Sequence, residues 1–124
     1  ILIPCRNEET NITECVESLI VQDYENLEIL LIDDNSTDST WNQLKNLASK
    51  FPQVSAFKGT PLPDNWAGKN WACHQLGQKA KGDFFLFIDA DTNLAKYSVS
   101  SALKHIEDNN LDCIYYFSSK KKNI

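Results

Sequence analysis

Residues 81–92 read Lys-Gly-Asp-Phe-Phe-Leu-Phe-Ile-Asp-Ala-Asp-Thr, and this stretch carries the strongest fold signal in the sequence. Residues 84–88 within it form the most apolar run of the chain, which predicts a strand buried on both faces. Gly82 and Asp83 predict a turn before that strand, and an acidic motif, Asp89-Ala90-Asp91, follows it directly. Strands buried on both faces are typical of parallel sheets that helices cover on each side.

Short apolar runs and helical patterns alternate along the rest of the chain. One helix face is marked by apolar residues at helical spacing, namely Ile12, Cys15, Val16, Leu19 and Ile20. We expect helices at residues 12–20, 41–51, 69–81 and 98–109, and strands at residues 1–3, 27–32, 54–57, 84–88 and 113–117. This order predicts an α/β fold whose Rossmann-like, mostly parallel sheet carries helices on both faces and is truncated after about five strands.

Polar clusters follow three of the expected strands, at residues 4–9, 33–38 and 89–91. Ligands of open α/β sheets bind beyond the carboxyl ends of the strands, so these clusters are the candidates for a site. Asp89 and Asp91 point to the same side of an extended chain, because successive side chains alternate. Their carboxylates repel each other, and a divalent cation with a preference for oxygen ligands, Mg²⁺ or Mn²⁺, relieves that repulsion. A solvated acidic turn is the alternative that this motif alone leaves open.

The second cluster, at residues 33–38, reads Asp-Asp-Asn-Ser-Thr-Asp. Asp, Asn and Ser are strong helix N-caps, so capping of the following helix explains part of this composition. We expect Asp34 to face a ligand, and Asp38 or Ser36 to cap the helix that begins near Thr37.

The composition is typical of one globular domain. The chain has 124 residues, of which 42% are apolar and 23% charged. Its formal net charge of −5 disfavours nucleic acid and anionic membranes as partners, because both favour basic surfaces. The cysteines are too scattered for a metal or redox pair and predict buried thiols in a reducing compartment; they are Cys5, Cys15, Cys73 and Cys113.

The two ends of the sequence suggest a piece of a longer protein. No apolar run reaches the ~18 residues needed to span a bilayer. The first residues do not read as a signal peptide, because the polar run Arg6-Asn7-Glu8-Glu9 follows at once. The sequence opens on an apolar strand without Met and stops soon after a basic run. We therefore expect a cytoplasmic fragment, with membrane association at the inner face through the missing part as a further expectation.

Three motifs together resemble, in order and spacing, the family 2 glycosyltransferases of the GT-A fold. They are Ile-Pro-Cys-Arg-Asn-Glu-Glu at residues 3–9, Leu-Ile-Asp-Asp-Asn-Ser-Thr-Asp at residues 31–38, and Ala-Lys-Gly-Asp-Phe-Phe-Leu-Phe-Ile-Asp-Ala-Asp-Thr at residues 80–92. Residues 62–73 are similar to the branch that glycosylates carotenoid acids or is associated with hopanoid synthesis. The resemblance implies that residues 1–124 are the nucleotide-diphospho-sugar-binding domain of a longer enzyme of the hexosyltransferase type.

The resemblance also implies a donor and a role for each candidate residue. The donor is a nucleotide-diphosphate sugar, with a UDP-sugar favoured, held through Mn²⁺ or Mg²⁺. Asp34 would accept a hydrogen bond from the base, and Lys69 would lie near the base or the phosphates. Asp91 would bind the metal directly, while Asp89 would contact the ribose or assist the metal. The implied donor-binding residues are Pro4, Arg6, Glu8, Asp34, Lys69, Asp89, Ala90 and Asp91.

The catalytic base is the part that the sequence does not supply. Inverting members of the family use a carboxylate in a second acidic motif to deprotonate the acceptor. Only Glu107, Asp108 and Asp112 follow Asp91, and none resembles that motif. We expect the base beyond residue 124, and an acceptor hydroxyl or carboxyl of unknown identity, with a lipid or a carotenoid as the implied classes.

Two other function classes remain open at this point. A phosphoacceptor receiver domain has similar βα alternation, clustered aspartates, Mg²⁺ and a lysine. Its acidic pair should end the first strand, however, where this chain has Pro4-Cys5-Arg6-Asn7. A sugar-nucleotide-binding module without catalysis fits the visible residues as well. A dinucleotide-dependent oxidoreductase is disfavoured, because no GxGxxG follows the first strand.

Overall fold

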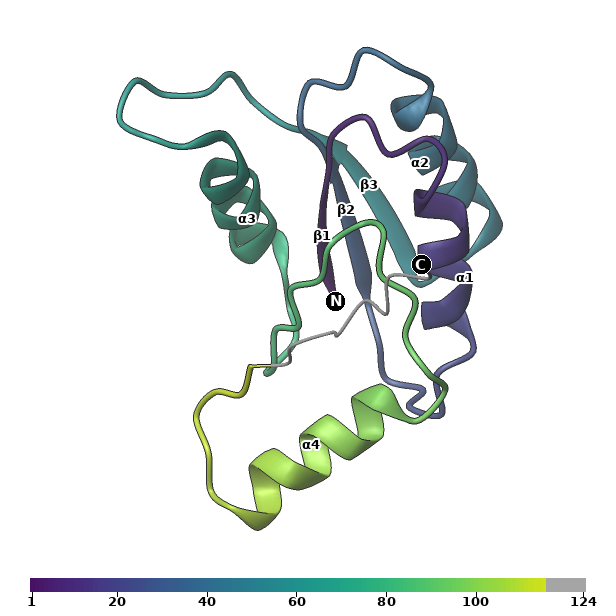
Figure 1. Cartoon of the computed structure of the whole chain (residues 1–124), viewed down its shortest axis with the longest axis vertical. Coiled ribbons are helices and arrows are strands. Elements are labelled where there is room, and N and C mark those ends of the chain that lie inside the picture. Colours follow the sequence, from purple (N-terminus) through teal and green to yellow (C-terminus); the bar gives the residue numbers. More distant parts are fainter. Residues whose placement is uncertain (116–124) are drawn as a thin grey trace, which may run out of the picture.

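The computed structural model describes residues 1–115, which form a parallel sheet flanked by helices (Figure 1). The strands are β1 (Leu2–Cys5), β2 (Ile29–Asp33) and β3 (Val54–Lys58). The helices are α1 (Ile12–Ile20), α2 (Thr40–Lys50), α3 (Gly68–Lys79) and α4 (Ser98–Asp108). The strand order β1-β2-β3 and the alternation of strands with helices confirm the predicted α/β architecture.

The register of the sheet brings the carboxyl ends of its strands to the same level. Cys5 at the end of β1 pairs with Asp33 at the end of β2, and Asp33 pairs with Lys58 at the end of β3. All three strands run parallel, so the loops that follow them leave the sheet at one edge. Gly59 allows the close approach there, because a Cβ on this residue would lie 3.1 Å from the Asp33 carbonyl oxygen.

Residues 84–88 lie on the other side of β1, in the place expected for the next strand. The Leu2 N–H donates to the Leu86 carbonyl at 2.8 Å, and the Ile88 N–H donates to the Leu2 carbonyl at 3.2 Å. The chain after β1 adds β2 and β3 on one side, whereas residues 84–88 return to the opposite side. The strand order therefore reverses between β1 and residues 84–88, which is where ligands bind in folds of this type.

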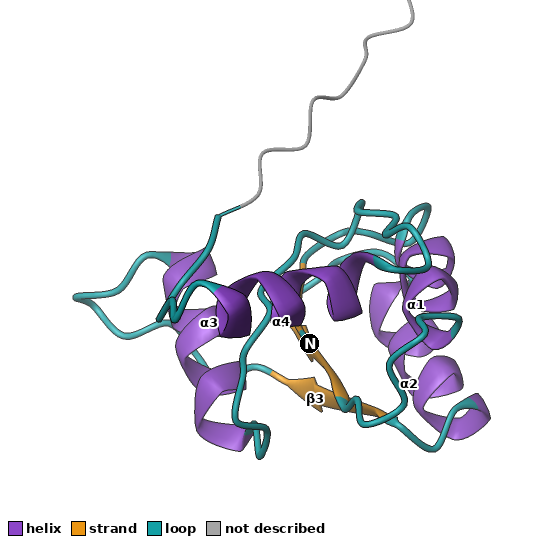
Figure 2. Cartoon of the chain, turned by 90° about the horizontal axis from the view of Figure 1, so that it is seen from below, coloured by secondary structure: helices purple, strands orange, loops and turns teal. Residues whose placement is uncertain are grey.

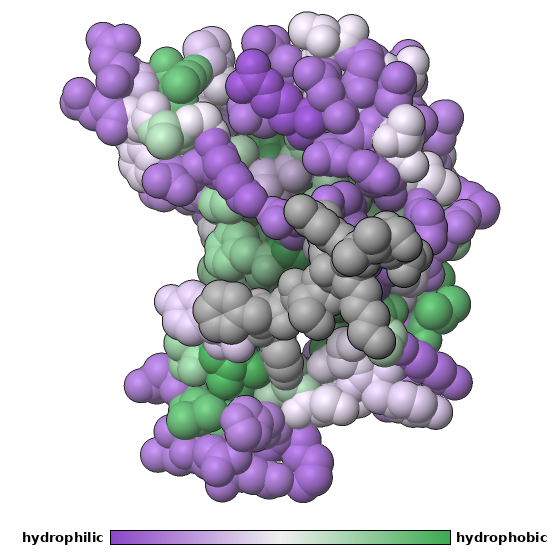
Figure 3. Space-filling view, in the orientation of Figure 1, coloured by the Kyte–Doolittle hydropathy of each residue, from purple (hydrophilic) through white to green (hydrophobic). Residues whose placement is uncertain are grey.

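The prediction that residues 84–88 form a strand buried on both faces is wrong. The pairing is one isolated parallel bridge, Leu2 with Phe87, and the exposed fractions of Phe84, Phe85 and Phe87 are 53%, 48% and 49%. Leu86 and Ile88 pack against the core, but among the described residues only β1 pairs with this segment. Figure 3 shows hydrophobic surface between α3 and α4 on this side of the molecule.

The strand predicted at residues 113–117 is also not found where it can be checked. Residues 113–115 adopt no regular structure, and residues 116 and 117 lie outside the described residues. A strand needs a neighbour to satisfy its backbone groups, and none of the described strands reaches this segment.

Helices cover both faces of the sheet. Figures 1 and 2 show α1 and α2 on one face and α3 on the other. Side chains of β2 alternate accordingly: Ile29 and Leu31 pack in the cluster with α1 and α2, whereas Leu30 and Ile32 pack against Leu76 of α3. All five residues of β2 are buried, as expected for a central strand of a parallel sheet.

Helix α4 lies apart from the two helical layers (Figure 1). Val99 is its buried residue, and the Val99 N–H donates to the Gln22 side chain at 3.2 Å. Within the described residues, none of the helices combines the length and the apolar character that crossing a membrane requires.

The buried face of β2 predicts a large stability effect at Leu31. This side chain is 0% exposed, so Leu31→Ala should lower the free energy of unfolding by about 2–5 kcal/mol through lost burial and a cavity. Leu62→Ala, at a loop residue that is 53% exposed, is the matched control and should change it by less than about 0.5 kcal/mol. Urea unfolding followed by circular dichroism measures both, and equal losses would contradict this packing.

The cysteines should differ in reactivity. Burial raises the pKa of the Cys5 and Cys15 thiols, that of Cys15 to about 12, so neither is ionised near neutral pH. Because the thiolate is the reactive form, iodoacetamide at about pH 8 should label exposed Cys113 in the native protein and reach Cys5 and Cys15 only after denaturation. Peptide mass spectrometry reads the labels. Native labelling of Cys15 as fast as Cys113 would show that the core is open.

Candidate functional site

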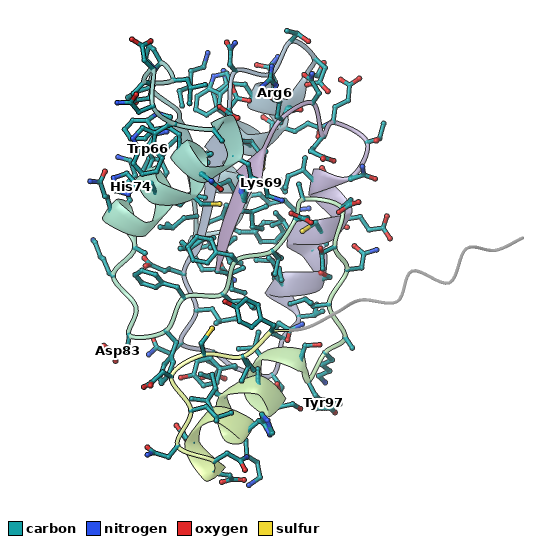
Figure 4. The ribbon with its side chains drawn as sticks, turned by 60° about the vertical axis from the view of Figure 1, so that its left-hand side comes forward. Arg6, Trp66, Lys69, His74, Asp83 and Tyr97 are labelled. Atoms are coloured by element: carbon teal, nitrogen blue, oxygen red, sulfur yellow. The ribbon has the colours of Figure 1, made fainter. Side chains whose placement is uncertain are left out.

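A cavity of about 520 Å³ opens at the carboxyl edge of the sheet, beside β1. Arg6 and Lys69 mark two of its sides in Figure 4. The structure brings together all eight residues that the sequence singled out, and two further residues complete the lining; the full set is Pro4, Cys5, Arg6, Glu8, Asp34, Gly68, Lys69, Asp89, Ala90 and Asp91.

The loop after β1 contributes Arg6 and Glu8. Arg6 is exposed, whereas Glu8 is partly buried and accepts a hydrogen bond from the Asn11 side chain at 3.0 Å. The Glu8 N–H donates to the Thr40 hydroxyl at 2.9 Å, which joins this loop to the first residue of α2. Glu8 is therefore held at two points, its backbone by Thr40 and its carboxylate by Asn11.

The loop after β2 divides its acidic residues between two tasks. Asp34 is partly buried and lines the cavity, and its N–H donates to the Cys5 carbonyl at 2.8 Å. Asp38 accepts a hydrogen bond from the Thr40 N–H at 2.9 Å, so it satisfies a backbone donor at the start of α2. The hydroxyl of Thr40, which also donates to Asp38, lowers the pKa of that carboxyl. Ser39 is the N-cap of α2 and makes no side-chain capping bond, so Asp38 serves the helix from the residue before the cap, and Ser36 takes no part. Asp34 lies on the cavity wall, and its contact with a ligand stays a prediction.

The start of α3 closes the opposite side of the cavity. A Cβ on Gly68 would lie 3.6 Å from an Asp34 carboxylate oxygen, so the first turn of α3 approaches Asp34 closely. The amino end of a helix carries partial positive charge and unpaired N–H groups, which favour anions. This end of α3 therefore offers donors to any anionic group that enters the cavity.

Lys69 and Asp89 form an ion pair across the cavity. The Lys69 ammonium donates to Asp89 Oδ1, and this hydrogen bond raises the pKa of Lys69. Both side chains are more than 60% exposed, so the pair adds little to stability. Its consequence is positional, because it links α3 to the turn that follows residues 84–88.

The side chains that line the cavity carry an excess of negative charge. Four carboxylates line it, from Glu8, Asp34, Asp89 and Asp91, against the two cationic side chains of Arg6 and Lys69. A divalent cation would offset that excess.

The donor set fits only one kind of metal site. Within residues 1–115, no three His, Cys, Asp or Glu side chains gather in a way that could hold a metal. Asp89 and Asp91 thus fit an ion bound by one or two carboxylates and completed by ligand phosphates and water, which is how Mg²⁺ is usually held.

Two lining residues were not among those singled out from the sequence. Cys5 contributes to the wall although its thiol is buried, and Gly68 begins α3. A glycine directly before Lys69 at a helix start is a signal that could have identified Gly68, because a helix amino terminus without a side chain allows close approach. Nothing in the sequence pattern distinguishes Cys5 from an ordinary core cysteine.

Comparison with known proteins identifies the family. The sequence profile described as Glycosyl transferase family 2 matches residues 1–122. An uncharacterized glycosyltransferase of Haemophilus influenzae is 32% identical over 112 residues, which are 90% of this chain and 43% of the relative. A 4,4'-diaponeurosporenoate glycosyltransferase of Staphylococcus haemolyticus is 30% identical over 94 residues, 76% of this chain and 24% of the relative. The chain therefore spans less than half the length of each relative.

Solved structures with the same fold include complexes with a nucleotide or a sugar nucleotide. Staphylococcus aureus TarS 1–349 in complex with UDP matches with a TM-score of 0.73 and 24% identity, over 98% of this chain and 38% of that one. The mannosyltransferase PcManGT from Pyrobaculum calidifontis, in complex with GDP-Man and Mn²⁺, matches with a TM-score of 0.73 and 25% identity, over 85% of this chain and 31% of that one. With its three motifs on one cavity and its sequence matched from residue 1 to residue 122, the chain belongs to glycosyltransferase family 2 and has the GT-A fold.

Proposed function

We propose that residues 1–124 form the nucleotide-diphospho-sugar-binding domain of a longer glycosyltransferase, and that the cavity beside β1 binds the UDP part of a UDP-sugar. The observation that carries this proposal is the convergence of all eight expected residues on one cavity, at the point where the strand order reverses. Nucleotide sugars are also the ligands of related solved proteins, since TarS has been solved with UDP-GlcNAc and PcManGT with GDP-Man.

The base would lie against the loops after β1 and β2. Asp34 can accept a hydrogen bond from N3–H of uracil, which cytosine lacks, so a carboxylate here would favour UDP over CDP. Pro4, Arg6 and Glu8 would form the adjoining wall of the nucleotide pocket. The free N–H groups at the start of α3, with Lys69 beside them, would face the base or the diphosphate.

Asp91 would hold a Mn²⁺ or Mg²⁺ ion directly, with Asp89 assisting or contacting the ribose and Ala90 spacing the two. When bound, the ion supplies Lewis-acid neutralisation of the charge on the leaving diphosphate. The excess of carboxylates in the cavity supports this proposal, and so does the Mn²⁺ in the PcManGT complex. Lys69 would help to orient Asp89 through the ion pair between them.

In the proposed transfer, these residues bind and orient the donor for attack from the opposite face of the sugar. An acceptor oxygen forms the new bond to the anomeric carbon as the bond to the diphosphate breaks, which inverts that carbon and releases UDP. The acceptor proton passes to a carboxylate that we place beyond residue 124. Holding the anomeric carbon in line is the contribution that this cavity can make.

The acceptor class and the cellular setting are inferred from relatives and composition. A hydroxyl or carboxyl of a lipid or carotenoid is the proposed acceptor, supported by the diaponeurosporenoate glycosyltransferase among the relatives. We place the protein in the cytoplasm, at the inner face of a membrane through a part outside this chain. Nucleic acid is not among the proposed partners, because the net charge is −5.

The proposal predicts that UDP binds this chain in a metal-dependent way. Titration calorimetry with UDP should show binding in the presence of Mn²⁺ or Mg²⁺ and a loss of at least about tenfold in affinity when the metal is chelated. Asp91→Asn removes the charge that holds the ion and should cause a comparable loss with the metal present.

Asp83→Asn is the matched control for this experiment. Asp83 precedes residues 84–88 and is exposed, and it lies outside the cavity (Figure 4). The control removes the same charge from the chain and should leave UDP binding unchanged. Binding of UDP without metal would contradict the proposed metal site. UDP binding by Asp91→Asn as tight as by wild type would show that Asp91 does not hold the ion.

A further inference from the structure

The two loops that form the nucleotide end of the cavity are fastened to each other through Asn7. The Asn7 N–H donates to the Ser36 hydroxyl at 3.0 Å. The Asn7 side-chain oxygen accepts from the Thr37 N–H at 2.8 Å and from the Thr37 hydroxyl at 3.3 Å. One residue of the loop after β1 thus makes three hydrogen bonds to two residues of the loop after β2.

Asn7 is placed between the two cavity residues of its own loop. Arg6 precedes it and Glu8 follows it, and both line the cavity although Asn7 does not. The partners of Asn7 likewise follow Asp34, the cavity residue of the other loop, by two and three positions. Any shift of Asn7 relative to Ser36 would therefore displace Arg6 and Glu8 relative to Asp34.

The backbone conformation at Asn7 is one that few residue types adopt. Its φ is 52°, in the left-handed region that Asn tolerates better than most residues. Asn35 in the facing loop has a φ of 56°, so both loops turn through a left-handed asparagine. Asn35, in contrast to Asn7, makes no side-chain hydrogen bond within residues 1–115.

A second set of contacts ties the loop after β1 to the start of α2, through residues that do not line the cavity. The Ser39 N–H donates to the Glu9 carboxylate at 2.9 Å, and the Gln43 side chain donates to the Glu9 carbonyl at 2.8 Å. With the bond from the Glu8 N–H to Thr40, these contacts hold the loop after β1 against α2 even without the Asn7 side chain. Removing that side chain should therefore alter the alignment of the loops at the cavity and leave the fold in place.

We propose that Asn7 is a positioning residue for nucleotide binding, which sets Arg6 and Glu8 on one loop at the correct offset from Asp34 on the other. This inference rests on the proposed function, because it takes the cavity to be the nucleotide site. A ligand binds less tightly when its binding must order exposed loops. Hydrogen bonds between the loops that exist before binding reduce this entropic cost. Asn7 does not contact the nucleotide itself and acts only by fixing the relative position of the two loops.

Asn7→Gly is the variant that isolates this effect. Glycine adopts a φ of 52° without strain, so the substitution deletes the side-chain hydrogen bonds to Thr37 and keeps the turn. Asn35→Gly is the matched control, since it makes the same change at the other left-handed asparagine. Calorimetric titration of the full chain with UDP and Mn²⁺ gives both the dissociation constant and the fraction of sites that bind.

A positioning role and a merely structural role give different results. If Asn7 positions the loops, Asn7→Gly raises the dissociation constant by a few-fold to about tenfold, because two hydrogen bonds to Thr37 are lost, with the binding stoichiometry and the thermal midpoint close to those of Asn35→Gly. If Asn7 only stabilises the fold, the stoichiometry and the midpoint fall while the remaining sites bind UDP as tightly as wild type. That second result overturns the inference.

Ser36→Ala tests the contact between the two loops from the loop after β2. It also provides a second test if Asn7→Gly does not fold. It deletes the hydroxyl that accepts from the Asn7 N–H and should also weaken UDP binding, by a few-fold. Unchanged affinity in both variants, with wild type binding normally, overturns the inference alone. Failure of the wild-type chain to bind UDP overturns the proposed function and this inference with it.

Discussion

The parallel hydrogen bonding of β1 on both of its edges is the constraint on which the rest of the structure depends. On one side β1 pairs with β2 from Leu2 to Cys5, and on the other Leu2 exchanges hydrogen bonds with residues 86 and 88. This central position sets the ends of β1, β2 and the 84–88 segment at one edge. Three polar loops that are far apart in the sequence therefore share one cavity.

The chemistry of that cavity follows from what each loop brings to it. The loops after β1 and β2 and the turn at residues 89–91 supply four carboxylates, whereas α3 supplies a lysine and the free N–H groups of its first turn. Anionic phosphates suit the α3 side, and a divalent cation suits the carboxylate side. A nucleoside diphosphate with a bound metal ion carries both kinds of group, which is why one ligand of this class can satisfy the whole cavity.

Much of this arrangement was predictable from the sequence, because its signals are local. The apolar spacing of residues 12–20 and the apolar run at β2 determine a helix and a strand by burial, and the structure confirms both. The strand expected at residues 54–57 is confirmed as β3, although within it Val54 alone is buried. The same reasoning failed at residues 84–88. Five apolar residues form a buried strand only where other elements cover them, and here Phe84, Phe85 and Phe87 remain about half exposed. The contacts of Asn7 with Ser36 and Thr37 were not predictable, since they join loops whose relative placement depends on the register of the sheet.

The central claim is that the cavity beside β1 holds the nucleotide diphosphate of a sugar donor. A crystal structure of this chain grown with UDP and MnCl₂ tests it most directly. The account predicts uracil within hydrogen-bonding distance of Asp34, and the diphosphate between the start of α3 and Asp91, with Mn²⁺ on the Asp91 carboxylate. UDP bound elsewhere, for example in the groove between Trp66 of the loop before α3 and Phe85, would contradict it.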